Sequence, residues 1–190
     1  TSTGFRIMAF GSPQWMYNSG SAYDIAQSLR FNQGDSPYLS RTPSSAGNRK
    51  TWTFSCWFKR SGIGAGTEII FSTPGDYIGF ASSDILNWAF ATEVDGDLKT
   101  TQVFRDPSAW YHLVCTSDTT QGVAANRAKI YINGSQITDF ATETYPAQNR
   151  EGNINNTNEH NLFEYQAYNE HGLEGYIAEV HFIDGTALTP

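Results

Sequence analysis

Positive charge is scarce in this chain of 190 residues. Lysine and arginine together number 12, and with 19 acidic residues they give a formal net charge of −7. The basic residues are scattered along the sequence. A nucleic-acid-binding protein usually gathers them on one face, and an anionic membrane surface attracts the same kind of cluster. We therefore expect no nucleic-acid partner and no binding to an anionic membrane surface.

Long apolar runs and helical periodicity are also nearly absent. No run approaches the roughly 18 residues that cross a bilayer, so membrane insertion is not expected. No signal-peptide pattern is present, and the best helical candidate, residues 22–29, is short. Because the chain starts without methionine and stops abruptly after Pro190, we expect it to be a segment of a longer protein.

Short apolar or alternating runs, separated by turn-forming residues, are abundant instead. Such runs predict β-strands. They cover residues 51–59, 68–72, 77–81, 85–91, 98–104, 110–116, 128–132, 135–137 and 175–183. About ten short strands with turns between them predict an all-β protein, an antiparallel β-sandwich or barrel.

Three of these segments carry finer predictions. Asn133-Gly134, between two strand runs, predicts a two-residue hairpin, because both residues of a type I′ turn need positive φ. Alternation in the first run places four side chains on one face: Trp52, Phe54, Cys56 and Phe58. Alternation in the last run does the same for four others: Tyr176, Ala178, Val180 and Phe182.

Three ordered groups of residues carry a resemblance to a known fold. They are Ser28–Asn32 with Thr51–Lys59, Trp110–Val114 with Lys129–Gly134, and Gly175–Val180 with Ala187-Leu188. In this order they resemble the laminin-G-like, concanavalin-A-like jelly roll. The resemblance implies a sandwich over residues 21–190. Residues 1–20, aromatic but broken by glycines, are expected to form an N-terminal arm that packs on a neighbour, or an edge strand.

A closer resemblance is to jelly-roll domains of marine bacteriophage virion proteins. It rests on the phrases Tyr38–Arg49, Phe104–His112 and Phe182–Pro190. It implies a non-enzymatic surface module of a virion, such as a tail fibre, assembled in the host cytoplasm. Such a module attaches to host-surface glycans through several weak sites at once. The implied partners are other virion proteins and copies of the same chain, with a trimer favoured. The alternative is a structural capsid decoration or tail component that makes only protein contacts.

An acidic segment, Glu93-Val94-Asp95-Gly96-Asp97, offers a second alternative. It is similar to the carboxylate strand of jelly-roll glucanases, which need two carboxyl groups about 5.5 Å apart. Gly96 after Asp95 favours a hairpin turn instead, so we expect no catalytic residue and no enzyme.

Calcium is the one cofactor that the resemblance suggests, because laminin-G-like domains often bind it at the rim of the sandwich. Calcium takes six to eight oxygen ligands. Asp95 and Asp97 are the candidate ligands, and the cluster of Asn and Glu residues at 153–159 is a second candidate. The alternative for both is a set of Asx turns, in which Asn and Asp bond their own backbone.

Glycan contact needs aromatic faces together with amides or carboxylates. Residues in or beside the expected loops that offer these groups are Trp88, Tyr145, Asn153, Asn155, Tyr165 and Tyr168. Each of the aromatic rings also suits the core or a subunit interface.

The two cysteines, Cys56 and Cys115, both fall on expected strands, among apolar neighbours. Pentraxins, which share the jelly roll, carry a disulfide between the corresponding strands, and the resemblance implies one alternative, a Cys56–Cys115 bond. Their second motif is His-x-Cys, whereas this chain has His112-x-x-Cys115. The other alternative is a pair of buried free thiols, as expected in a reducing cytoplasm.

Overall fold

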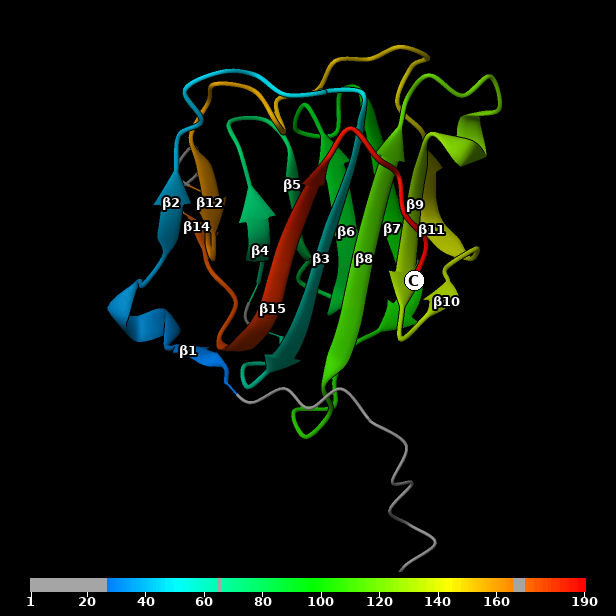
Figure 1. Cartoon of the computed structure of the whole chain (residues 1–190). Coiled ribbons are helices and arrows are strands. Elements are labelled where there is room, and N and C mark those ends of the chain that lie inside the picture. The colour runs from blue at the N-terminus through cyan, green and yellow to red at the C-terminus, as the bar shows by residue number, and fades with distance from the viewer. Residues whose placement is uncertain (1–26, 65, 166–169) are drawn as a thin grey trace, which may run out of the picture.

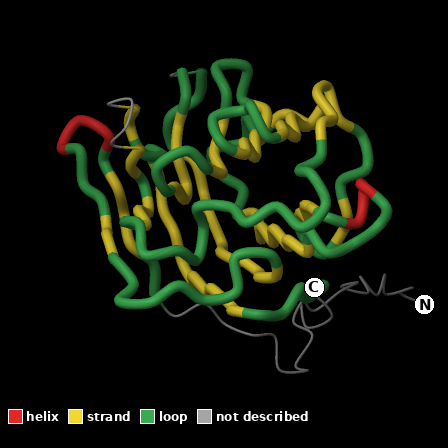
Figure 2. Tube along the Cα trace, turned by 90° about the horizontal axis from the view of Figure 1, so that it is seen from above, coloured by secondary structure: helices red, strands yellow, loops and turns green. Residues whose placement is uncertain are grey.

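The computed structural model describes residues 27–64, 66–165 and 170–190. Its strands form two antiparallel sheets that face each other (Figure 1), and the two layers are seen from above in Figure 2. The expected antiparallel β-sandwich is therefore confirmed. The expected N-terminal arm, residues 1–20, lies outside the described residues. Within the described residues, no helix is long and apolar enough to cross a membrane.

The first sheet has six strands. In spatial order they are β1 (Leu29–Phe31), β15 (Gly175–Asp184), β3 (Thr51–Arg60), β8 (Tyr111–Asp118), β9 (Ala128–Ile132) and β10 (Ser135–Gln136). Asn133 and Gly134 have φ values of 51° and 81° between β9 and β10, as the Asn-Gly signal predicts. Leu29, the last residue of the short helical candidate over residues 22–29, begins β1 instead; residues 22–26 lie outside the described part.

The second sheet has seven strands. In spatial order they are β11 (Phe140–Thr144), β7 (Gly96–Val103), β6 (Ile85–Phe90), β5 (Tyr77–Phe80), β4 (Glu68–Ser72), β12 (His160–Leu162) and β2 (Leu39–Arg41). A small hairpin of β13 (Glu164–Tyr165) and β14 (Glu170–His171) follows β12. The short 3-10 helices η2 (Gln33–Asp35) and η3 (Ala124–Asn126) lie in loops.

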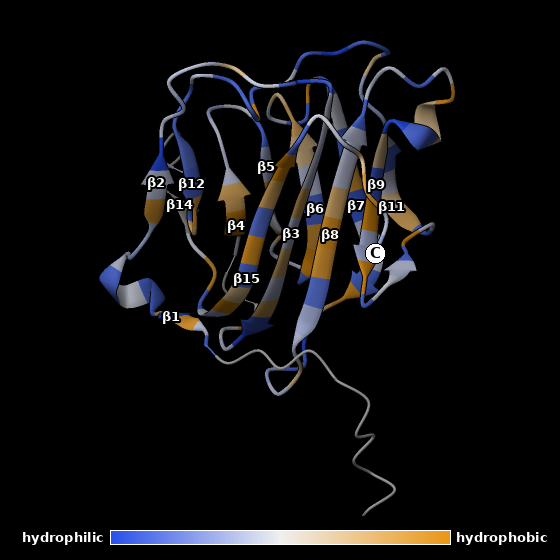
Figure 3. Cartoon of the chain, in the orientation of Figure 1, coloured by the Kyte–Doolittle hydropathy of each residue, from blue (hydrophilic) through white to orange (hydrophobic). Residues whose placement is uncertain are grey.

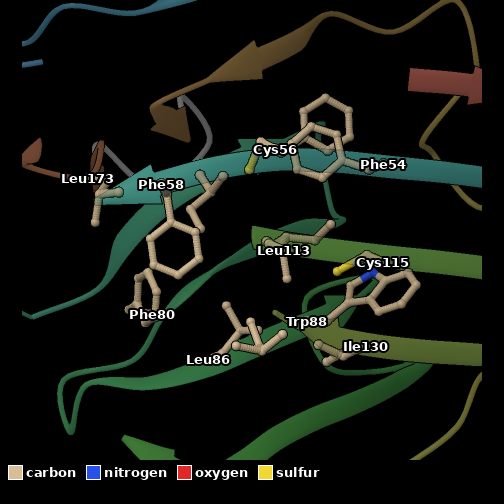
Figure 4. Packing of buried hydrophobic residues seen from close by; sticks show 14 of the residues in the cluster. Phe54, Cys56, Phe58, Phe80, Leu86, Trp88, Leu113, Cys115, Ile130 and Leu173 are labelled. Carbon is tan, nitrogen blue, oxygen red and sulfur yellow. The ribbon is translucent and has the colours of Figure 1, made fainter. Parts of the chain in front are cut away.

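The core fills the space between the sheets. The four β3 side chains predicted to share a face are all buried in one hydrophobic cluster: Trp52, Phe54, Cys56 and Phe58. From the second sheet they meet aromatic rings: Phe54 stacks on Phe71 at 4.7 Å, and Trp52 packs at a tilt against Trp88 at 5.5 Å. Figure 4 shows part of this cluster, including Phe54, Cys56, Phe58 and Trp88, and Figure 3 shows hydrophobic residues along the central strands.

The last strand differs from its predicted alternation. β15 contains a bulge between Ala178 and His181, and Glu179 has φ of 48°. The extra residue shifts the alternation, because a strand turns each successive side chain to the opposite face. Phe182 therefore faces the core, 6.2 Å from Phe71, while Tyr176 lies near Trp110 on the outer side. The prediction that Tyr176 and Phe182 share a face is wrong.

A buried ionic cluster closes one end of the sandwich. Arg60 is 0% exposed and ion-pairs with Glu68 and, at 2.9 Å, with Asp84. It also donates to the carbonyl of Phe104 at 2.7 Å, and its guanidinium lies over the Phe80 ring. Burial raises the pKa of Glu68 in spite of the arginine.

Both cysteines are free and buried. In the register of β3 and β8, Cys56 lies opposite Leu113 and Cys115 opposite Phe54, so the two residues are diagonal neighbours on the inner face. Of the two alternatives left open by the sequence, the structure contains the pair of thiols. Burial raises the pKa of both, so neither is an activated nucleophile.

Candidate functional site

The acidic segment after β6 forms a turn. Ala91, Thr92 and Glu93 have φ values of 48°, 55° and 70°, and β7 begins at Gly96. The hairpin turn favoured by Gly96 is therefore confirmed. Glu93 is not on a strand, so the regular alternation of carboxylates that jelly-roll glucanases use is not formed.

The turn nevertheless brings two of its carboxylates to one lysine. Lys99 Nζ lies 2.9 Å from Glu93 Oε1 and 2.8 Å from Asp97 Oδ2. Glu93 Oε1 also accepts hydrogen bonds from Tyr77 at 3.3 Å and from Asn87 at 3.4 Å, and Asn87 donates to the Tyr77 hydroxyl at 2.8 Å. We call Tyr77, Asn87, Glu93, Asp97 and Lys99 the Lys99 cluster.

Strand register places this cluster on the outer face of the seven-stranded sheet. Asn87 on β6 is directly opposite Lys99 on β7, and Ala89 is opposite Asp97. Their neighbours Trp88 and Leu98 point the other way and are wholly buried in the core. On the outer face, Tyr77 packs beside Tyr165 of β13, with ring centroids 5.4 Å apart. The β13 segment therefore borders one side of the cluster.

The cluster contains buried polar atoms with unused hydrogen-bonding capacity. The side chain of Asp97 is only 8% exposed, and Asn87 is 2% exposed. Within the described residues, Asn87 Oδ1 and Asp97 Oδ1 are buried and have no hydrogen-bond partner. A buried acceptor without a donor costs free energy. Donors from outside this part of the chain, such as ligand hydroxyls or water, would satisfy both atoms.

The three charged groups affect one another's titration. A hydrogen bond from Lys99 is the main cause that lowers the pKa of Glu93. Burial raises the pKa of Asp97, and Lys99 offsets only part of that effect. Burial alone would lower the pKa of Lys99, but its bonds to the two carboxylates outweigh this and raise it. Lys99 therefore stays charged across the physiological range.

The two predicted calcium ligands, Asp95 and Asp97, pair with different cationic side chains. Asp95 accepts a hydrogen bond from Arg150 Nε at 3.0 Å, while Asp97 is paired with Lys99. Each carboxylate thus has a cationic side chain where a calcium ion would have to bind. Across residues 27–64, 66–165 and 170–190, no group of three or more His, Cys, Asp or Glu is arranged to hold a metal ion.

A second candidate surface is a groove of about 650 Å³ where the two sheets separate, which we call the inter-sheet groove. Phe54, Phe71, Val180 and Phe182 contribute to its apolar lining. Polar side chains from the loops, from β2 and β12, and from the end of β15 complete the lining: Ser40, Arg41, Ser45, Asn155, His160, Asn161 and Asp184.

Asn155 belongs to the wall of this groove. Its amide nitrogen donates to the Asn48 carbonyl at 3.1 Å and to Asp184 Oδ1 at 2.6 Å. Its backbone carbonyl accepts from Gly47 N at 2.9 Å. Asn155 therefore ties its own loop to the loop at Gly47-Asn48 and to the end of β15, and its amide nitrogen is already engaged within the chain.

The other predicted glycan contacts are dispersed. Trp88 is 0% exposed and Tyr165 is 2% exposed, so neither ring is presented to solvent. Tyr145 is half-buried against the core, and its hydroxyl donates to Glu143 at 2.9 Å. Asn153 donates its backbone N–H to Asp76 at 2.6 Å. Tyr168 lies outside the described residues.

Sequence reasoning missed Tyr77, Asn87 and Lys99 as members of a cluster. A signal for the last two was present, because Asn87 interrupts the apolar run of β6 and Lys99 stands in alternation with buried Leu98. The antiparallel pairing of β6 with β7, which brings these residues together, was not specified by the sequence pattern.

The neutral side chain of His160 holds the loop beside the inter-sheet groove through two hydrogen bonds. Its Nε2 accepts a hydrogen bond from Asn155 N at 2.9 Å, so its Nδ1 carries the proton and donates to the Asn158 carbonyl at 2.8 Å. Burial, together with the nearby Arg41 guanidinium, lowers the pKa of His160. Protonation of Nε2 would place two donors face to face.

The chain should therefore lose stability on acidification. Because the folded pKa lies below the ordinary value of about 6.5, the contribution of His160 is complete above that pH and decreases as the pH falls below it. Thermal unfolding at pH 7.5 and 5.5 measures the loss, and the His160→Gln variant, whose amide oxygen can still accept from Asn155 N, should lose less. An identical pH dependence of the two proteins would contradict this role.

The fold agrees with that of known proteins that the chain resembles. A family model described as the concanavalin A-like lectin/glucanases superfamily matches residues 32–190. The chain therefore belongs to that superfamily, within its laminin-G-like group. In a search of curated protein sequences, no protein matches the chain.

Three solved structures illustrate the shared fold. A heptameric SAP-like pentraxin from Limulus polyphemus is 17% identical, with a TM-score of 0.60 over 88% of this chain and 80% of its own. Domains LG4-5 of the mouse laminin alpha1 chain are 12% identical, with a TM-score of 0.56 over 86% and 43%. Domain 4 of a GH43 arabinanase from Geobacillus stearothermophilus, solved with arabinotriose, is 14% identical, with a TM-score of 0.52 over 85% and 84%.

Proposed function

We propose that this chain is a non-enzymatic glycan-binding module and that the Lys99 cluster forms part of its binding surface. The observation that carries the proposal is a pair of buried acceptors, Asn87 Oδ1 and Asp97 Oδ1, which have no hydrogen-bond partner among the described residues and lie beside a lysine on an outer sheet face. Membership in a superfamily of lectins and glucanases supports the same ligand class.

The chemistry of the cluster suits sugar hydroxyls. Asn87 and Asp97 supply acceptors for hydroxyl donors, and the remaining N–H of Lys99 can donate to a hydroxyl or ring oxygen. The ring of Tyr77 is buried beside Tyr165, so it closes one border of the cluster and is not itself presented to a sugar. Because the chain carries a net charge of −7, neutral sugars suit it better than acidic ones.

Hydrolysis is not part of the proposal. A retaining glycosidase needs two carboxyl groups on either side of the scissile bond, one of them a protonated acid. In this cluster the ammonium of Lys99 lies within 3 Å of both Glu93 and Asp97, where a glycosidic oxygen would have to enter. Both carboxylates are therefore paired with the same ammonium group.

The wider setting of the proposal is a phage virion, assembled in the host cytoplasm. It rests on the resemblance of Tyr38–Arg49, Phe104–His112 and Phe182–Pro190 to marine phage virion domains. The module attaches as an oligomer, a trimer in our proposal, so that several weak sites act together. Its partners are other virion proteins and a host-surface glycan. The competing proposal is a capsid decoration or tail component with protein contacts only.

An array of bacterial surface glycans tests the proposal, with the protein presented multivalently. We expect saturable binding to a narrow set of glycans. Glu93→Gln, which keeps the shape of the side chain but weakens the pairing with Lys99, should reduce affinity about tenfold, the effect of about 1.4 kcal/mol. Glu151→Gln removes an exposed carboxylate elsewhere on the surface and serves as the matched control.

Three outcomes would count against parts of the proposal. Absence of binding to every glycan would favour the capsid or tail component. Equal loss of binding in the two variants would remove the Lys99 cluster from the site. Release of reducing sugar by the wild type, abolished in a Glu93→Gln variant, would establish a glycosidase. Repeating the array with millimolar calcium and then with a chelator tests the calcium prediction.

A further inference from the structure

The inter-sheet groove has the size and composition of a site for a small apolar ligand. Its volume of about 650 Å³ lies within the roughly 300–1,000 Å³ of small-molecule sites. Several of its apolar side chains are open to solvent: Val180 and Phe182 of β15 are 37% and 38% exposed, and Leu39 of β2 is 47% exposed. Single exposed apolar side chains are ordinary, but a group of them around one concave surface is typical of a binding site.

Aromatic rings form the floor of the groove. Phe182 packs beside Phe71, with ring centroids 6.2 Å apart, and Phe71 stacks on Phe54 at 4.7 Å. Phe54 and Phe71 are buried in the core, whereas Phe182 reaches the opening. An apolar chain that lay on this floor would remove the exposed parts of Leu39, Val180 and Phe182 from water, which is favourable.

One cation stands at the same surface. Arg41 is directly opposite His160 in the pairing of β2 with β12, so the two side chains lie on the same face. The His160 ring lies 5.9 Å from that of Phe71, which places this face toward the groove. Both residues contribute to the lining. Arg41 is exposed, and among the described residues its guanidinium has no ion pair and no hydrogen bond.

Two neighbouring polar side chains of the groove are engaged within the chain. His160 is neutral, and both its ring nitrogens are bonded to the adjacent loop. Asp184 Oδ1 accepts hydrogen bonds from Asn48 N at 2.8 Å and from the Asn155 amide at 2.6 Å. Arg41 therefore supplies the one charge of the described lining that lacks a partner in the described part of the chain. The complement of this charge is an anionic group.

We propose that the inter-sheet groove binds a fatty acid, a small molecule with an aliphatic chain and a terminal carboxylate. The chain lies on the rings of Phe71 and Phe182, and the carboxylate pairs with the guanidinium of Arg41. A guanidinium suits this role because it donates two parallel hydrogen bonds to one carboxylate. This site shares no residue with the Lys99 cluster and goes beyond the glycan binding proposed there.

The rest of the molecule restricts the ligand further. A sugar suits the groove poorly, because the apolar side chains of the floor offer no hydrogen bonds to its hydroxyl groups. The net charge of −7 opposes the approach of any anion to the chain as a whole. A carboxylate is therefore retained only where a local cation and burial of its aliphatic chain act together, as they do in this groove.

Calorimetric titration of the full-length chain with octanoate, decanoate and dodecanoate, each below its micellar concentration, tests the proposal. Because each buried methylene contributes about 0.8 kcal/mol, affinity should rise about fourfold per methylene along the series. Decanol has the same chain as decanoate without the charge, and it should bind about tenfold more weakly or less, because it lacks the charge-assisted pairing.

Three variants assign the site. Arg41→Gln should weaken decanoate binding about tenfold and leave decanol binding unchanged. Leu39→Gln should weaken the binding of both ligands, because it places an amide on the apolar wall. Arg30→Gln is the matched control: Arg30 is exposed on the outer face of the six-stranded sheet, beside Tyr176, and its loss should change affinity by less than about twofold. All three side chains are exposed, so the variants should unfold at the wild-type temperature.

Four results would overturn the proposal. Absence of saturable binding would show that the groove of the full-length chain holds no fatty acid. Equal affinity for decanoate and decanol would remove the carboxylate from the recognition. Equal loss of affinity in Arg41→Gln and Arg30→Gln would show that binding follows the total charge of the chain. Binding to phosphatidylglycerol vesicles without binding of free decanoate would assign this surface to a lipid bilayer instead.

Discussion

Arg60→Ala is expected to lower the free energy of unfolding by about 3–5 kcal/mol, the cost of removing one partner from a buried ion pair. Glu68, wholly buried, and Asp84, 3% exposed, would lose the guanidinium that lies between them. The Phe104 carbonyl would lose its donor as well. Urea unfolding at neutral pH measures the change.

Arg105→Ala is the matched control for this prediction. Arg105 pairs with the same Asp84 at 2.9 Å, but its side chain is 58% exposed. Exposed pairs contribute about 0–1 kcal/mol, because water replaces the lost partner. A similar effect of the two substitutions would mean that burial of Arg60 does not determine its contribution.

Trp88→Ala should destabilise the chain by about 3–5 kcal/mol, as large-to-small substitutions of buried aromatic residues do. Trp88 is 0% exposed and packs with Trp52 and, at 4.8 Å, with Phe90, so its removal leaves a cavity between the sheets. Thermal and urea unfolding measure the loss. We expect Trp88→Ala to change glycan binding only by unfolding the chain, because the ring is wholly buried.

Trp57→Ala provides the comparison for the core tryptophan. Trp57 is half-buried on the outer face of the six-stranded sheet, where its ring stacks on His112 at 5.0 Å. Because no enclosed cavity forms at an outer face, the loss of stability should be clearly smaller than for Trp88→Ala. Equal losses would contradict the placement of Trp88 at the centre of the core.

The sequence was most informative where one local rule decides the structure. Alternation in β3 determined its buried face, because a strand between solvent and core must separate apolar from polar side chains. Asn133-Gly134 determined a hairpin, and Gly96 after Asp95 indicated a turn. Each of these depends on the conformational preferences of a few neighbouring residues.

The rest depends on partners distant in sequence. The short strands β2 and β12 pair with each other, from Leu39 with Leu162 to Arg41 with His160, and neither has a strong strand pattern. The bulge at Glu179 reversed the faces of β15 without any glycine to mark it. The Lys99 cluster arises only when β6 and β7 pair, so its residues could not be grouped from spacing alone.

The burial of the two thiols slows their chemistry in the native state. Cys56 and Cys115 lie on neighbouring strands inside the sandwich, and the thiolate, which is the form that oxidants and alkylating reagents attack, is suppressed there by burial. Such reagents reach the sulfur atoms only when the two sheets separate. Oxidation of this pair is therefore expected to be slow for as long as the domain stays folded.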